Sequence, residues 1–199
     1  MKKLFLLAIA LLSFAGVNAQ EREGTMTVQP RVGMNLSSMT DYNKMYFGYA
    51  FGMEAEYQMT DILSLSAALM YSGQGGIDDE TGQKEILDVD FVNVPVMLNC
   101  YVLPGLAVKA GMQPSFRTKT TVKYDGTKMD VDWLLDRYGN DTKMNKFMFS
   151  VPVGISYEYK HVVLDARYIF GTTDLFHGPG TLRNNVLQVT LGYKFEVDL

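Results

Sequence analysis

The sequence predicts an all-β fold, an eight-stranded antiparallel up-and-down transmembrane β-barrel with a filled lumen. Three observations lead to this fold class. Apolar and polar residues alternate strictly over residues 187–195, as in a strand with one apolar and one polar face, and the pattern recurs in seven earlier segments. A secretion signal precedes these segments. The connections between them alternate short with long, which is typical of outer-membrane barrels with short periplasmic turns and longer outer loops.

The first 19 residues have the parts of a secretory signal peptide. Lys2 and Lys3 precede an apolar run over residues 4–12, and residues 17–19 fit the small-x-small cleavage rule. The run is too short for the alternative, a membrane-spanning helix. We expect residues 1–19 to be removed and residues 20–199 to form one barrel domain in the outer membrane of a Gram-negative bacterium. The remaining 16 basic and 22 acidic residues leave a net charge of −6, which argues against a nucleic-acid partner.

The first four expected strands cover residues 27–37, 47–58, 63–72 and 87–102. The first alternates aliphatic with polar residues, and the second alternates an aromatic ladder with glycines and carboxylates. The third alternates leucines with serines, and the fourth alternates valines with polar residues. Residues 59–61 and 103–105 are read as tight turns, the latter from its Pro-Gly pair, and residues 38–44 and 73–84 as loops.

The last four expected strands cover residues 106–116, 147–159, 162–170 and 187–195, each with the same alternation. Residues 160–161 form the third tight turn, and residues 171–185 form a loop. The longest loop, residues 117–145, contains the only Trp and has room for a short hairpin or helix of its own. Loops of this length are usually functional or mobile.

The polar face of the expected strands carries the charge. A soluble barrel of this kind would place its large residues inside and its charges outside, so the reverse arrangement predicts a lipid-facing exterior. An eight-stranded barrel is just wide enough to be filled by its own side chains. We therefore expect the inward charges to pair into a lumen network rather than to line a channel. These residues are Arg31, Glu54, Glu56, Lys109, Glu158, Asp165, Arg167 and Lys194.

Four prolines fall inside expected strands, where a missing N–H interrupts the hydrogen-bond ladder. They are Pro30, Pro95, Pro114 and Pro152. A closed barrel has no edge strand to hold them, so the sequence predicts β-bulges or shifted strand ends at these positions.

Four stretches resemble the outer-membrane β-barrel family of the Bacteroidetes, often called "porin family" or PorT-like proteins. They are residues 31–37, 69–76, 91–98 and 192–195, and their order and spacing are more specific than any one of them. The third is similar to the family's "IEIPVLLK" strand. The resemblance implies a barrel in the outer membrane and no particular activity, although some members resemble accessory factors of a secretion apparatus.

Evidence for catalysis or metal binding in the sequence is weak. His161 lies in an expected periplasmic turn, and His177 lies in a loop near Asp174, so an outer-leaflet enzyme is the least favoured reading. The loop acids, residues 78–80 among them, lack EF-hand spacing and are read as solvated. We expect no enzyme, no cofactor, no catalytic residue and no metal site.

The expected function is a non-enzymatic surface, scaffold or accessory role through the outer loops, with a narrow pore for small solutes as the alternative. Loop 117–145 is the candidate site for a protein partner because it combines apolar and acidic residues. The other expected partners are outer-membrane lipid, lipopolysaccharide and, during biogenesis, the barrel-assembly machinery. The candidate partner residues are Asp130, Asp132, Trp133, Leu134 and Leu135.

Overall fold

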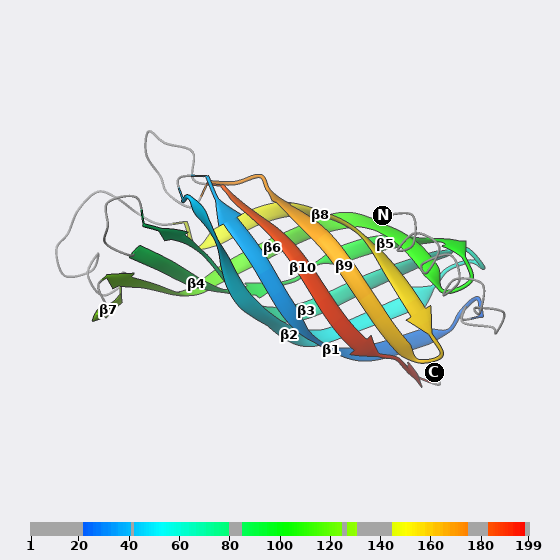
Figure 1. Ribbon diagram of the computed structural model, residues 1–199. Coiled ribbons are helices and arrows are strands. Elements are labelled where there is room, and N and C mark those ends of the chain that lie inside the picture. Colours follow the sequence, from blue (N-terminus) through cyan, green and yellow to red (C-terminus); the bar gives the residue numbers. More distant parts are fainter. Residues whose placement is uncertain are drawn as a thin grey trace, which may run out of the picture.

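The structure, a computed structural model, describes residues 22–40, 42–79, 85–124, 127–130, 145–174 and 183–197. The expected signal peptide, residues 1–19, lies outside these ranges. The described chain is a succession of antiparallel strands (Figure 1). They are β1 (Met26–Met39), β2 (Lys44–Gln58), β3 (Leu63–Asp78), β4 (Glu85–Asn93), β5 (Val96–Leu103), β6 (Leu106–Tyr124), β7 (Thr127–Asp130), β8 (Phe147–Tyr159), β9 (Val162–Gly171), β10 (Asn184–Tyr193) and β11 (Phe195–Val197).

The strands close into a ring with eight positions. β4 and β5 share one position between β3 and β6, and β10 and β11 share another between β9 and β1. β10 pairs with β1 from Arg31↔Gly192 to Met39↔Asn184, which closes the barrel. All ring neighbours pair antiparallel. The prediction of an eight-stranded up-and-down barrel is confirmed.

The two ends of the barrel differ. At one end, here named the turn end, β1 begins beside β11, and short turns join β2 to β3, β5 to β6 and β8 to β9. At the opposite end, the loop end, β7 pairs with the last residues of β6 and lies beyond the other strands (Figure 1). The strands run obliquely around the barrel between these ends (Figure 1), as ring closure requires.

Several strands extend further toward the loop end than the sequence predicts. Residues 73–78, read as loop, continue β3 and pair with β4 as far as Asp78↔Glu85. Residues 117–124, also read as loop, continue β6 and form a hairpin with β7. The first connection is short, because β1 ends at Met39 and β2 begins at Lys44. The glycines of residues 73–76 suggest a loop by composition, but in the structure Tyr rings of β2 and of the β1–β2 connection pack over them.

Three of the four in-strand prolines lie at breaks in the pairing rather than at bulges, whereas Pro152 lies within β8 and pairs with Ile169 of β9 without a bulge or break. Val94 and Pro95 separate β4 from β5, and the Val94 N–H donates to the Pro114 carbonyl oxygen at 2.9 Å. The Pro95 carbonyl oxygen accepts from the Ala68 N–H at 2.9 Å. Pro30 lies where the partner of β1 changes from β11 to β10. The shared break therefore accommodates two prolines at little cost in backbone hydrogen bonds.

The alternation sorts side chains into two faces. Large apolar residues are exposed on the outer face at every ring position; examples are Val32, Phe51, Leu69, Leu98, Val108, Ile155, Leu164 and Leu191. The inner face is buried and mostly polar. No helix among the described residues is long and apolar enough to cross a membrane.

Candidate functional site

The lumen contains all eight charged residues that the sequence assigns to it. Each is 4% exposed or less. No other charged residue with a described side chain is buried to this degree. They come from six parts of the ring and form two clusters of ion pairs.

The larger cluster, named the central cluster, joins three cations to two carboxylates. Glu54 contacts Arg31, Lys109 at 3.2 Å and Arg167 at 3.2 Å. Asp165 contacts the same three cations, Arg31 at 3.0 Å, Lys109 at 3.1 Å and Arg167 at 2.7 Å. Every carboxylate is therefore paired with every cation, across strands β1, β2, β6 and β9.

The smaller cluster, named the turn-end cluster, surrounds Lys194. Its Nζ lies 3.1 Å from Glu56 Oε2 and 2.7 Å from Glu158 Oε2. The Tyr101 hydroxyl donates to Glu56 Oε1 at 2.7 Å, and Asn99 Nδ2 donates to the same oxygen at 3.1 Å. Lys194 occupies the single residue between β10 and β11, so the strand break lies at the position of this cation.

The charges cancel over the two clusters together, but not within each. The central cluster has three cations and two carboxylates, and the turn-end cluster has one cation and two carboxylates. Burial of an unpaired charge is costly, and a buried pair is tolerated only when its partners are well placed. Adjacent clusters of opposite net charge satisfy this requirement for the whole lumen.

A layer of amides and hydroxyls lies between the charges and the loop end. Gln188 Nε2 donates to Asn35 Oδ1 at 2.9 Å, and Asn93 Nδ2 donates to Ser72 Oγ at 2.8 Å. Asn35 Nδ2 also donates to the Gly73 carbonyl oxygen at 3.1 Å. These bonds join β10 to β1 and β4 to β3 across the lumen side of the wall.

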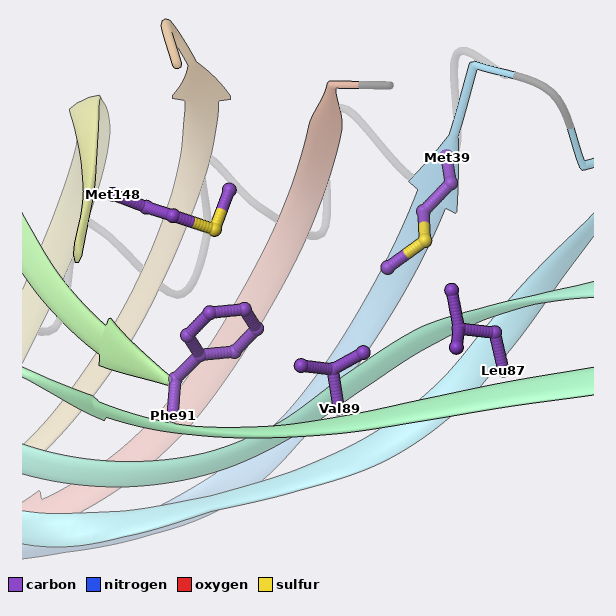
Figure 2. Packing of buried hydrophobic residues seen from close by; sticks show 5 residues of the cluster. All are labelled: Met39, Leu87, Val89, Phe91 and Met148. Carbon is purple, nitrogen blue, oxygen red and sulfur yellow. The ribbon is translucent and has the colours of Figure 1, made fainter. Parts of the chain in front are cut away.

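An apolar cluster, named the cap, fills the lumen nearest the loop end. Its members are all 4% exposed or less. Figure 2 shows their side chains pointing toward one another from β1, β4 and β8. A cavity of about 10 Å³ remains beneath the cap, lined in part by Gln74, Gln113 and Phe91, with space for about one water molecule. The cap consists of Met39, Leu87, Val89, Phe91 and Met148.

The sequence interpretation did not identify the cap, although a signal for it exists. Over residues 92–102 the valines and Leu98 point outward, whereas in β4 Leu87, Val89 and Phe91 point inward and Asp88 and Asp90 point outward. This reversal of polarity is the pattern of a barrel wall surrounded by water. It marks the part of the wall that extends beyond the apolar band.

A charged hollow of about 300 Å³ lies on the outside of this part of the wall. Lys123 Nζ lies 3.6 Å from Asp88 Oδ2. The Tyr49 hydroxyl donates to Asp90 Oδ1 at 2.8 Å. The hollow is lined by Asp88, Asp90, Lys119, Thr121, Lys123, Lys128 and Met129.

A β-bulge directs the lysines of β6 into this hollow. Asp90 pairs with Lys119, and the next residue of β4, Phe91, pairs with Arg117. Thr118 lies between the two pairs and is therefore the extra residue. Its hydroxyl donates to the Asp90 carbonyl oxygen at 3.0 Å. Ser115 points inward before the bulge and Thr120, which is fully buried, points inward after it. Continued alternation would have placed Lys119 inside, and bulges of this kind redirect side chains.

The sequence matches the family described as outer membrane protein beta-barrel domain over residues 18–177. The chain belongs to this family. The exposed apolar band of this outer-membrane barrel therefore faces lipid, and its location in the outer membrane of a Gram-negative bacterium is confirmed. In this architecture short turns face the periplasm and longer loops face outward, which assigns the loop end to the outer surface.

Solved structures of other outer-membrane barrels have the same fold. The Ail protein of Yersinia pestis is 12% identical, with a TM-score of 0.56, and the match covers 87% of this chain and 99% of Ail. The Neisserial surface protein A is 16% identical, with a TM-score of 0.55, over 87% of this chain and 100% of that protein. Identities this low establish the fold alone. No curated protein matches the sequence.

The remaining candidate residues are distributed along this outer-membrane barrel. Asp130 ends β7, and residues 132–135 of the candidate partner loop lie outside the described ranges, as does His177. His161 lies in the β8–β9 turn at the turn end, where its ring packs 5.6 Å from that of Tyr193. The described residues contain no group of three or more His, Cys, Asp or Glu that is arranged to hold a metal ion.

Proposed function

We propose that this outer-membrane barrel is a non-enzymatic surface protein that does not conduct solutes and acts through the wall and loops at its loop end. The observation that carries the proposal is the filled lumen. Ion pairs occupy its centre and its turn end, and the cap closes it toward the loop end.

A solute pathway through this lumen would require several paired groups to separate. Asp165 and Glu54 each pair with three cations, and all five side chains are 3% exposed or less. Breaking one partner out of a buried ion pair costs about 3–5 kcal/mol. Opening would also expose the apolar side chains of the cap. The arrangement supports a structural plug and disfavours the alternative, a narrow pore.

The sheet beyond the barrel ring supports a role in contacting a partner. The ends of β3, β4 and β6 continue past the ring, and β7 pairs with β6 alone among the described strands. Residues 131–144, which include Asp132, Trp133, Leu134 and Leu135, follow β7 directly. The pairing of β7 with β6 fixes the chain just before the candidate partner loop, which favours binding because less conformational freedom is lost on association.

Relatives of the fold and the sequence resemblance support the same role. The Yersinia pestis barrel is named the attachment invasion locus protein, and one of its structures, with a TM-score of 0.51, holds the heparin analogue sucrose octasulfate. The resemblance to Bacteroidetes PorT-like proteins favours an accessory role toward another outer-membrane protein. Phe195 in β11 is a candidate contact for the barrel-assembly machinery during biogenesis.

Conductance tests the first part of the proposal. The purified protein, inserted in a planar phosphatidylcholine bilayer, should show no unitary current steps under applied voltage. Reproducible steps from the folded protein would establish the pore and end this proposal. Activity toward lipid or peptide substrates that disappears in His177→Ala would instead establish an outer-leaflet enzyme.

Crosslinking in cells tests the second part. An affinity tag placed within residues 80–84 leaves the candidate partner loop untouched. A stoichiometric outer-membrane partner should be recovered with the wild-type protein and lost when residues 130–136 are replaced by a Gly/Ser linker of the same length. The matched control replaces residues 176–182 in the same way and should retain the partner. Recovery of the barrel alone, or equal loss in both variants, would contradict a role for loop 117–145.

A further inference from the structure

We propose that the charged hollow on the outer wall binds the phosphorylated sugar head group of an outer-leaflet glycolipid, the chemistry of lipopolysaccharide. The inference concerns a different surface from the partner loop and holds whether or not a protein partner exists. It rests on three observations. The lysines point outward, two of them have no anionic partner among the described side chains, and the hollow lies directly beyond the apolar band of the barrel wall.

Two lysines of the hollow have no anionic partner among the described side chains. Lys123 is held by Asp88 at 3.6 Å, whereas no described carboxylate pairs with Lys119 or Lys128, both of which are exposed. Lys123 and Lys128 are direct cross-strand neighbours in the β6–β7 hairpin. Like charges in that position repel each other, and an anion bound between them would relieve the repulsion.

The bulge shows that the wall itself directs the charge outward. If Thr118 took part in a regular alternation instead of being the extra residue of a bulge, Lys119 would point into the lumen. Because of the bulge, Lys119, Thr121 and Lys123 share the outer face, and the residues between them point inward. Three side chains with hydrogen-bond donors therefore face the same hollow from one strand, and Lys128 faces it from the next.

The height of the hollow identifies the ligand as a lipid. On β4 the outward residues change from apolar to charged between Val92 and Asp90, which are neighbours on the outer face. On β6 the same change occurs between Phe116 and Lys119, across the bulge. Two residues of strand advance about 7 Å, so the hollow begins directly beyond the apolar band. A head group bound there has its acyl chains beside Val92 and Phe116. A soluble ligand would gain nothing from this position.

The lining also fits both parts of a phosphorylated sugar. Lysine ammonium groups bind phosphate through charge-assisted hydrogen bonds. Asp88 and Asp90 are acceptors for sugar hydroxyls, and Asp90 is oriented by the Tyr49 hydroxyl at 2.8 Å. The volume of about 300 Å³ is at the lower end of the range for small-molecule sites.

Native mass spectrometry of the full chain in dodecyl maltoside tests the proposal, with diphosphoryl lipid A as the probe. Wild type should retain lipid A, and Lys119→Gln/Lys128→Gln should bind it about tenfold more weakly, because two charge-assisted contacts are lost. The matched control, Lys44→Gln/Lys146→Gln, removes two exposed lysines elsewhere at the loop end and should bind as wild type does. Heat-modifiable gel mobility verifies that each variant is folded.

Two further probes distinguish the sources of phosphate. Dephosphorylated lipid A should bind about tenfold more weakly than the diphosphoryl form to wild type, and millimolar inorganic phosphate should not displace lipid A. Equal loss of lipid A binding in both double variants would mean that lysines anywhere at the loop end attract the lipid through their charge, and it would overturn the proposed site. Unchanged binding in Lys119→Gln/Lys128→Gln would overturn it as well. Displacement of lipid A by inorganic phosphate would overturn the assignment of the ligand as a lipid and indicate a soluble phosphorylated ligand.

Discussion

Replacing Asp165 by Asn tests the ion-paired lumen at its most connected point. Asp165 is fully buried and contacts Arg31, Lys109 and Arg167 at 2.7–3.1 Å. Asn has nearly the same shape, so the substitution removes the charge with little change in packing. The three cations are then left with Glu54 as their one carboxylate in the cluster.

The magnitude follows from the number of contacts. An ion pair at about 4 Å gains about 4 kcal/mol of Coulomb energy at an effective dielectric constant near 20, most of which desolvation offsets. Removing one partner of a buried pair nevertheless costs about 3–5 kcal/mol, because the other charge stays buried without compensation. Three cations lose a partner here, so we expect a decrease in the free energy of unfolding of about 5 kcal/mol.

Urea unfolding in phosphatidylcholine vesicles measures this decrease, with the folded fraction read from the gel mobility of unheated samples. Asp61→Asn, an exposed carboxylate in the β2–β3 turn, is the control and should change the free energy of unfolding by less than about 0.5 kcal/mol. Asp165→Asn/Arg167→Gln removes one charge of each sign, and coupling of about 1–3 kcal/mol should make it more stable than the single variants predict. A loss below about 1 kcal/mol in Asp165→Asn, or strict additivity in the double variant, would refute the reasoning.

Two more predictions concern the loop end. Phe91→Ala empties the centre of the cap and should lower the free energy of unfolding by about 3–5 kcal/mol in the same assay. The control, Phe116→Ala, lies on the exposed outer face and should lower the free energy of unfolding clearly less. Equal decreases in the two variants would contradict a packed cap. Deleting Thr118 removes the extra residue and should leave the inward and outward positions of β6 unchanged, because Arg117 and Lys119, which pair with consecutive residues of β4, then follow each other directly. In a Cys100→Ser background, a Cys at position 120 should be inert to a membrane-impermeant maleimide and a Cys at position 119 should be reactive, both with Thr118 present and after its deletion. Equal labelling of the two positions would contradict the assignment.

The fold was predictable because its main determinant is local. A period of two needs no knowledge of distant residues, and in β8 the predicted and observed strand, residues 147–159, coincide. The charges of the lumen were predictable for the same reason, since Glu54, Asp165 and Lys194 lie on the polar face of an otherwise apolar alternation. Their partners were not predictable, because pairing depends on which strands are neighbours and on their register.

The errors at the loop end have one physical cause. The interpretation assumed that loss of the apolar-outward pattern means loss of strand, so residues 73–78 and 117–124 were read as loops. In the structure these residues remain in strands, and the environment of the wall changes instead from lipid to water. Alternation in a water-exposed wall has the opposite polarity, as Asp88 and Val89 show.

The amino-acid sequence by itself determined that the chain forms strands with one polar and one apolar face, and hence that it forms an outer-membrane barrel with charges inside. Only the tertiary structure decided how those charges divide into two clusters, that the cap closes the loop end and that Lys119 points outward. These features depend on contacts between strands far apart in the chain and on a single extra residue, Thr118, in β6. Because the side-chain period is two, one extra residue shifts the inward positions of β6 from odd to even residue numbers, and the local pattern cannot locate it.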